Sequence, residues 1–356
     1  MDLIKNGAAH IQNLIDSAKA EGTNCVTVTG NYEMEKTVLI PSDFCLVLEN
    51  CYLCMAEGTF CNMFTNESCR KNNNITDKNI IIEGRGRVVL DGGKYNGLSE
   101  KNSLKDDNPH ICVNNVILFT NVDGFCIKNI HIRNQRWWAM NFIFCCNGKI
   151  SDIDFLADYT RIDENGNRVE GLTKDDYPGT HIKNADGIDL RCGCHDIIIE
   201  NITGFCEDDS VALTGLDGDM ENFFAPQNAV KDIYNVIIRN IMTSSFCSNV
   251  RLLNQGGIKL YNVLVDGVFD TSKDSRYMDK GWFGVRIGDT HLYGERHSTE
   301  DETFNITVKN VYSRGEAALY LAGAMKNCHF ENINIFEDGE QLVINRSTSD
   351  TEKFFK

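Results

Sequence analysis

The chain has 356 residues, a net charge of −16 and a hydrophobic content of 42%. Its length exceeds that of the usual single-core domain, but a solenoid escapes this limit because its core grows along one axis. Only four prolines and 29 glycines argue against a disordered chain. No cluster of Lys and Arg offsets the negative charge, so nucleic acid is excluded as an expected partner.

The N-terminal residues 1–22 lack the continuous apolar run of a signal peptide, and no stretch is long and apolar enough to span a membrane. The 15 cysteines therefore predict a cytoplasmic protein whose thiols stay reduced. Cys51-x-x-Cys54 and Cys192-Gly-Cys194 are not joined by a second pair at zinc-site spacing. We predict neither a metal nor a cofactor.

The first expected element is a short amphipathic helix over residues 8–20, which Glu21-Gly22 ends. The apolar residues that recur there at helical spacing are Ile11, Leu14, Ile15 and Ala18. Terminal repeats of a solenoid need a cover for their open apolar end. We therefore predict that residues 1–22 cap the first coil.

One phrase then recurs along the chain: an asparagine, an alternating apolar run and often a second asparagine. The copies occupy residues 79–93, 125–134, 149–157, 196–204, 235–244, 260–268, 305–315 and 328–336. Their spacing of mostly about 24 to 46 residues fits coils with loop insertions. Three or four strands per coil, with alternate residues facing inward, predict an all-β fold. The fold class is a single-stranded right-handed parallel β-helix (β-solenoid) with a short N-terminal capping helix, forming one domain over residues 1–356.

A β-sandwich is the competing interpretation of these short strands, but the regular period and the weak hairpin signals count against it. Polar stretches at residues 94–110, 158–181 and 215–228 interrupt the pattern. Such insertions in repeat proteins commonly line the binding face. We expect these loops to enclose a groove or a pocket.

Two short acidic clusters flank the apolar run at residues 197–199. The first is Asp186 and Asp189, and the second is Glu207, Asp208 and Asp209. Asp208 follows Asp186 by 22 residues, a length typical of one solenoid coil. Adjacent coils would bring the clusters to about 4.8 Å along the axis on one face. Crowded carboxylates raise at least one pKa, and a protonated acid beside an ionised base is what glycosidic cleavage requires. The alternative is that these residues only cap turns.

The motifs, in their order along the chain, resemble those of the polygalacturonases, glycoside hydrolase family 28. NADGID at 184–189 looks like the family's N-T-D-G-I-D, EDDSVAL at 207–213 like D-D-C-V-A-I, and GVRIGD at 284–289 like G-V-R-I-K. The resemblance covers roughly residues 6 to 340 and implies a β-helix hydrolase that acts on pectin-related or other oligosaccharides with inversion. Two positions depart from the pattern: residues 244–250 contain no histidine, and Gly288 stands where the family has lysine.

Carried over onto this chain, the resemblance implies that Asp208 is the general acid and that Asp186 and Asp209 activate water. It also implies substrate contacts from Asn184, Asp189 and Arg286, all of which lie within the matched motifs.

Other residues are predicted to bind substrate because of their chemistry and place. Trp137 and Trp138 are adjacent, so on a strand one ring points outward, and comparison with the family favours Trp138 for stacking on a sugar. Arg251 is expected to reach the groove. His291 and Tyr293 follow the GVRIGD motif and would partly replace the missing lysine and histidine.

The sequence thus predicts a glycosidase whose partner is an oligosaccharide or polysaccharide, while the oligomeric state stays open. Two alternatives remain. One is a β-helix carbohydrate-binding or scaffold protein that has lost activity along with the histidine and lysine. The other is a β-helix lyase or glycosyl-transferring enzyme, although no basic cluster accompanies Asp186 for proton abstraction.

Overall fold

A computed structural model describes residues 2–57, 59, 61–93, 114–135, 137–157, 161–162, 168–169, 185–255, 257–275, 278–290, 293 and 296–356. Among these residues, none of the helices has the length and the apolar character needed to cross a membrane. Most of the predicted loops at 94–110 and 158–181 lie outside the described residues. The third, 215–228, carries a short helix.

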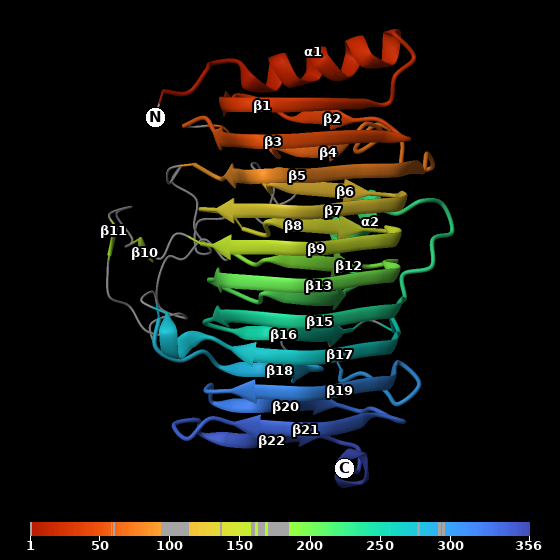
Figure 1. Ribbon diagram of the computed structural model, residues 1–356. Coiled ribbons are helices and arrows are strands. Elements are labelled where there is room, and N and C mark those ends of the chain that lie inside the picture. The colour runs from red at the N-terminus through yellow and green to blue at the C-terminus, as the bar shows by residue number, and fades with distance from the viewer. Residues whose placement is uncertain are drawn as a thin grey trace.

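Two short helices, two single turns of 3-10 helix and many strands follow one another along the chain (Figure 1). In order, they are α1 (Gly7–Ala20), β1 (Cys25–Met34), β2 (Val38–Ile40), β3 (Phe44–Met55), β4 (Phe64–Asn66), β5 (Asp77–Asp91), β6 (Ile117–Thr120), β7 (Val122–Arg133), β8 (Met140–Ile143), β9 (Cys146–Leu156), β10 (Arg161–Ile162), β11 (Arg168–Val169), β12 (Ile188–Arg191), β13 (His195–Cys206), β14 (Val211–Gly215), α2 (Asp219–Phe224), β15 (Ile233–Ser245), β16 (Ser248–Asn254), β17 (Leu260–Asp270), η3 (Ser272–Asp274), β18 (Phe283–Ile287), β19 (Thr303–Ser313), β20 (Ala317–Gly323), β21 (His329–Ile335), β22 (Gln341–Ser347) and η4 (Glu352–Phe354).

The strands form two parallel ten-stranded sheets, which we call sheet A and sheet B. Sheet A has the order β1-β3-β5-β7-β9-β13-β15-β17-β19-β21, and sheet B has the order β2-β4-β6-β8-β12-β14-β16-β18-β20-β22. Successive strands alternate between the sheets, so the chain winds as a right-handed parallel β-helix from α1 at one end to the C-terminus at the other (Figure 1). The predicted fold class is confirmed. β10 and β11 pair only with each other.

Each described coil contributes one long strand and one shorter strand, rather than the three or four strands that the sequence predicts. The difference lies in the long strands of sheet A. Residues such as Asn201 and Asn240 adopt left-handed φ values of 58° and 55° in mid-strand, while the pairing to the neighbouring strand continues on both sides. The sequence pattern predicts a break between two strands at these asparagines. In the structure, the chain bends there within one strand.

Asparagine occupies these left-handed positions because it tolerates positive φ better than most residues with a side chain. The asparagines also bond to one another along the axis. The Asn262 amide donates to Asn235 at 3.1 Å, and the Asn305 amide donates to Asn262 at the same distance. Neighbouring coils thus repeat the same polar contact, which explains why asparagine recurs in most copies of the sequence phrase.

The core is a stack of inward-facing aliphatic side chains that runs the length of the coil. One row of it is Ile127, Ile150, Ile199, Ile238, Val265 and Val308, which are in register on neighbouring strands of sheet A and have no exposed surface. Burying each such side chain contributes about 1.5–3 kcal/mol relative to leaving it exposed. This row fixes the lateral register of the strands, and hence the positions of the residues at their ends.

The helix α1 covers the open end of the first coil, as the sequence predicts (Figure 1). Its apolar face buries Ile11 and Ile15 in the core. Glu35 accepts hydrogen bonds from the backbone N–H groups of Ala8 and Ala9 at 3.1 and 3.0 Å, which satisfies the first turn of the helix. The Gln12 side chain accepts from the N–H of Leu39 at 2.8 Å, which ties the helix to β2.

Candidate active site

The two acidic clusters lie on adjacent coils at the edge of sheet B. Asp186 precedes β12, and Asp209 precedes β14, which pairs with β12 from Ile188 opposite Val211. A backbone hydrogen bond joins the two coils at this point, because the Gly187 N–H donates to the Asp209 carbonyl at 3.0 Å. Asp186 and Asp209 are therefore lateral neighbours, one strand spacing apart, in a register of 23 residues, one more than the interval from Asp186 to Asp208 on which the prediction rests.

Three carboxyl groups of this cluster are almost completely buried. The exposed fractions are 5% for Asp186, 1% for Asp189 and 6% for Asp209. One oxygen of each has no hydrogen-bond partner: Oδ1 of Asp186, Oδ2 of Asp189 and Oδ1 of Asp209. Leaving a buried acceptor unsatisfied costs about 1–3 kcal/mol, and more when the group is charged. Such a concentration of carboxylate oxygens without a hydrogen-bond partner is typical of a site that binds a ligand.

Burial is the main cause of the raised pKa values in this cluster, and like charge is the second. The pKa of Asp186 is raised well above its usual value by burial and then by Asp189, Asp208 and Asp209. Burial and the neighbouring aspartates also raise the pKa of Asp189, against the opposing charge of Arg191. The pKa of Asp209 is raised to about 6, by burial first and by Asp208 second. The cluster therefore retains protons near neutral pH.

Asp208 differs from its neighbours in exposure and in contacts. It is half-buried at the turn between β13 and β14. Its Oδ1 accepts a hydrogen bond from the N–H of Asp209 at 2.9 Å, and its carbonyl accepts one from the Ser245 hydroxyl at 2.6 Å. These two bonds fix the turn, so the side chains of Asp208 and Asp209 occupy different positions at the same edge.

A row of outward-facing residues on sheet B continues from the acids along the axis. The residues in register are Asn141, Asp189, Ala212, Arg251, Arg286 and Tyr320, on β8, β12, β14, β16, β18 and β20. We call this set the sheet B row. The small side chain of Ala212 separates an amide and an acid on one side from two guanidinium groups on the other. The row thus places an acid on one side of Ala212 and two cations on the other.

Both arginines of the sheet B row have unused donors. Arg251 is 5% exposed, and its Nε and Nη2 have no hydrogen-bond partner. The half-buried Arg286 has a free Nε, and its guanidinium carbon lies 5.0 Å from the centre of the Tyr320 ring. The buried Asn141 has both amide atoms free. Sequence analysis missed Asn141, because only the strand register places it beside Asp189.

Asp289 is a second residue that the sequence analysis overlooked. It is 1% exposed, its Oδ1 has no hydrogen-bond partner, and Arg286 Nη2 lies 3.9 Å away from that oxygen. Its Oδ2 accepts from the Gln255 amide at 3.2 Å and from the N–H of Tyr293 at 3.1 Å. Asp289 ends the GVRIGD motif, so the motif was a usable signal. The predicted contact Tyr293 is 51% exposed, and its ring centre lies 5.7 Å from the Arg251 guanidinium carbon.

The prediction that one of the two tryptophans points outward is wrong. Trp137 has a φ of 50° and lies in a bend rather than a strand, so the alternation of a strand does not apply. Both rings are buried in a satellite cluster with Leu118. Arg191 covers one face of Trp138 at 4.1 Å and pairs with Glu221 of α2 at 2.8 Å. This packing accounts for Trp138 as a structural residue.

One of the two departures from the family motifs, the glycine at position 288, has a local structural explanation. In the segment without histidine, Ser248 lies beside Asp209, since its carbonyl accepts from Ser210 N–H at 3.0 Å. Gly288 has a φ of 78°, and a Cβ there would lie 2.1 Å from the carbonyl oxygen of Ala322. Lysine therefore does not fit at position 288 in this backbone. The predicted contacts Asn184 and His291 lie outside the described residues.

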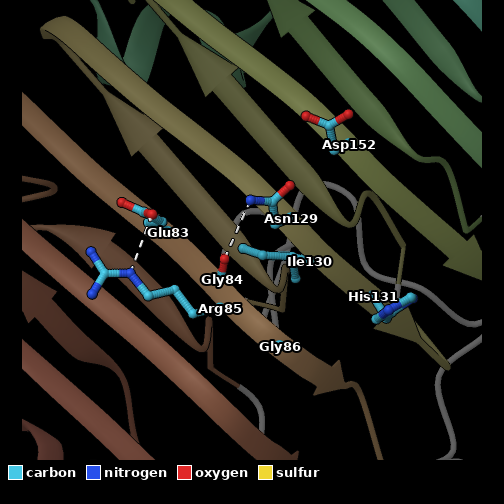
Figure 2. Close-up of a pocket in the computed structure, with 8 residues that line it drawn as sticks. All are labelled: Glu83, Gly84, Arg85, Gly86, Asn129, Ile130, His131 and Asp152. Atoms are coloured by element: carbon cyan, nitrogen blue, oxygen red, sulfur yellow. Dashed lines mark hydrogen bonds and ion pairs between the residues drawn. The ribbon is translucent and has the colours of Figure 1, made fainter.

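A surface hollow of about 540 Å³ lies away from the acids, on sheet A between β5, β7 and β9, where Glu83, Arg85, His131 and Asp152 surround it (Figure 2). Glu83 pairs with Arg85 at 3.3 Å there, and the Asn129 amide donates to the Gly84 carbonyl at 3.3 Å. These polar groups satisfy one another. The described part of the chain contains no cluster of residues suited to hold a metal ion.

The fold and the acids together define a right-handed parallel β-helix with buried aspartates on adjacent coils. No protein-family model and no curated sequence matches this chain. Among solved structures, it is similar to an exopolygalacturonase from Thermotoga maritima, with a TM-score of 0.54, 13% identity and coverage of 94% of this chain and 87% of that one.

Two further solved structures share this fold. The 1,3-α-1,4-β-D-galactose-4-sulfate-3,6-anhydro-D-galactose-2-sulfate 4 galactohydrolase gives a TM-score of 0.57 at 12% identity, over 96% of this chain and 86% of that one. The A-module of the mannuronan C-5 epimerase AlgE4 from Azotobacter vinelandii gives 0.56 at 13% identity, over 94% and 76%. At such identities the likeness concerns the fold, which is common to proteins named for different polysaccharide reactions.

Proposed function

We propose that this protein is a glycoside hydrolase that cleaves pectin-related or other oligosaccharides by carboxylate acid–base catalysis. The observation that carries the proposal is the cluster of Asp186, Asp208 and Asp209 on adjacent coils, in which Asp186 and Asp209 have free buried oxygens and raised pKa values. These raised pKa values keep a proton within the cluster near neutral pH, and general acid catalysis needs a proton in the site. The similarity to polysaccharide-degrading β-helix proteins supports the same class of substrate.

In the proposed reaction, Asp208 donates its proton to the departing glycosidic oxygen as the bond from that oxygen to the anomeric carbon breaks. Asp186 and Asp209 hold a water on the other side of the sugar. Asp209 takes a proton from this water as its oxygen bonds to the anomeric carbon, which inverts the configuration. The roles follow the resemblance to the polygalacturonases. A pKa of about 6 leaves most of Asp209 ionised at pH 7, as a base requires.

The free polar atoms of the sheet B row support binding of the sugar chain along the axis. The amide of Asn141 and the guanidinium groups of Arg251 and Arg286 offer donors that the protein itself leaves unused. A buried polar atom that regains a partner on binding gives both affinity and orientation. In this proposal, the sugar at the cleaved bond lies over Ala212, where the row has only a small side chain.

A screen of the purified protein against neutral and acidic oligosaccharides tests the proposal, with products identified by mass and by anomeric NMR. We expect hydrolysis with inversion, which Asp186→Asn and Asp209→Asn abolish. Asp16→Asn on the exposed face of α1 is the matched control and should retain full activity.

Two other outcomes would replace the proposal. Oligosaccharide binding without turnover, unchanged by Asp186→Asn and Asp209→Asn, would show a binding protein. Unsaturated or epimerised products would show a lyase or an epimerase, the reaction named for one of the structural neighbours.

A further inference from the structure

Arg251 on β16 is the cationic residue of the sheet B row that lies nearest to Asp209 in register. It pairs with Ala212 of β14, the strand that follows Asp209 directly, so one strand spacing separates the two coils. We propose that Arg251 is a positioning residue that keeps the Asp209 carboxylate ionised. The proposal concerns the charge state of Asp209, and only its consequence for turnover rests on the proposed hydrolase function.

Asp209 and Arg251 are both buried, so the charge of one strongly affects the ionisation of the other. Asp209 and Arg251 are 6% and 5% exposed, so water screens neither charge effectively. Oδ1 of Asp209 and both Nε and Nη2 of Arg251 have no hydrogen-bond partner. Both groups thus have buried, unused polar atoms on neighbouring strands of sheet B. In a buried site, an opposite charge one strand away acts on a carboxylate much more strongly than it would in water.

The groups around Asp209 are mostly acidic. Asp208 lies in the same turn, Asp186 precedes the neighbouring strand β12, and Asp189 lies on it. Their charges, together with burial, favour a neutral Asp209. Two thiols also pack nearby, Cys206 at the end of β13 and Cys247 before β16.

Among the described residues of the coils that follow, the cations that oppose these acids are Arg251, one strand away, and Arg286, two strands away. Burial and Asp208 raise the pKa of Asp209 to about 6, while Arg251 is the strongest of the influences that lower it, ahead of Ser248 and Arg286. Burial lowers the pKa of Arg251, but the charge of Asp209 and the ring of Tyr293 outweigh that effect and raise it. The two residues therefore stabilise each other's charged form.

The consequence for chemistry is that Asp209 is about nine-tenths ionised at pH 7. Without Arg251, the protonated fraction at pH 7 would increase, and a protonated carboxyl cannot accept a proton from water. The 244–250 segment contains no histidine that would supply a second positive charge there. Arg251 thus offsets the negative charge of the crowded acids, which would otherwise favour a protonated Asp209.

The first experiment measures the charge state directly. The protein is labelled with ¹³C at the Asp side-chain carboxyl, and the Asp209 signal is assigned by its absence in Asp209→Asn. Arg251→Gln should raise the titration midpoint of that signal by roughly one pH unit or more, because a unit charge one strand away in a buried site is removed. Arg251→Lys keeps the charge and should leave the midpoint near that of the wild type.

Arg239→Gln is the matched control, because Arg239 lies on β15 in sheet A and pairs with Glu200 at 2.6 Å, away from the acids. It should leave the Asp209 midpoint unchanged. If Arg251→Gln does not fold, Arg251→Met keeps the apolar stem and removes the same charge. An unshifted midpoint in a folded variant without the charge would overturn the proposal.

The second experiment follows turnover against pH with an oligosaccharide that the wild type hydrolyses. The ratio of Arg251→Gln turnover to wild-type turnover should be lowest near pH 6 and rise as the pH increases, because Asp209 of the variant then ionises without help. A uniform loss at every pH would indicate structural damage and contradict the proposed role. The two experiments also separate the hypotheses. A shifted midpoint with no hydrolysis would support the role of Arg251 and contradict the hydrolase function. Hydrolysis with an unshifted midpoint would support the hydrolase function and contradict the role of Arg251.

Discussion

Replacing Asp209 with asparagine should stabilise the protein at neutral pH while it removes activity. The asparagine keeps the shape of the side chain and mimics the protonated acid. Burial and Asp208 raise the pKa of Asp209 from 3.8 to about 6, so the folded state binds this proton more tightly than the unfolded chain does. The stabilisation from this group is complete below pH 3.8 and is lost as the pH rises through about 6.

The size of the effect follows from the same shift. A difference of about two pKa units corresponds to roughly 3 kcal/mol between the protonated and the ionised folded forms. For a chain of 356 residues, an unfolding entropy of about 2.1 cal/mol/K per residue converts this into a rise of about 4 °C in Tm at pH 7.5. Near pH 4 the variant and the wild type should unfold at the same temperature.

Thermal unfolding followed by circular dichroism at pH 4, 6 and 7.5 measures this difference. Asp16→Asn serves as the control, since Asp16 is exposed on α1 and its replacement should not change Tm with pH. A destabilised Asp209→Asn, or a gain that is equal at all three pH values, would refute the reasoning. The first result would mean that the carboxylate is satisfied in the fold, and the second that the gain has nothing to do with charge.

Four further predictions address the mechanism, the motif departures and the thiols. Asp208→Asn should lower turnover of an unactivated glycoside by roughly 10²–10⁴ and that of a substrate with a good leaving group by less, as comparison of kcat on the two substrates would show. Gly288→Lys should lower Tm and fail to improve hydrolysis of polygalacturonate, because the φ of 78° and the Ala322 carbonyl exclude a side chain. Polygalacturonate should be a poorer substrate than neutral or mixed oligosaccharides, given the net charge of −16, and product release rates would test this. Titration of the denatured, unreduced protein should find close to 15 free thiols, because the sequence predicts that the cysteines stay reduced.

The sequence predicted the fold well because the repeated phrase contains the two features that build the coil. Alternating aliphatic residues such as Ile199 and Ile238 form the inward rows, and asparagines such as Asn235 and Asn262 form the polar ladder. Both features have a short period that a single chain displays directly. The number of strands per coil was wrong, because a left-handed asparagine bends a strand without ending it.

The candidate site was predictable where it depends on spacing along the chain, as for Asp186 and Asp209. It was not predictable where it depends on the register between distant strands. Asn141 meets Asp189 only through the pairing of β8 with β12. The expectation that one of the two tryptophans points outward was wrong, because the left-handed Trp137 breaks the alternation of a strand. Local backbone departures of this kind leave no periodic trace in a sequence.

The lateral register described for the core also fixes the distance along the axis between residues on different strands. The acids and the arginines occupy separate strands, and the core row and the asparagine ladder repeat the same contacts from one strand to the next. Inserting one whole coil between β14 and β16 would move Arg251 away from Asp209 by one further step of about 4.8 Å without disturbing any contact inside a coil. Distances within such a site change in discrete steps, so duplication of a coil offers a route to new substrate spacings that leaves the pairing of the coils of Asp186 and Asp209 in place.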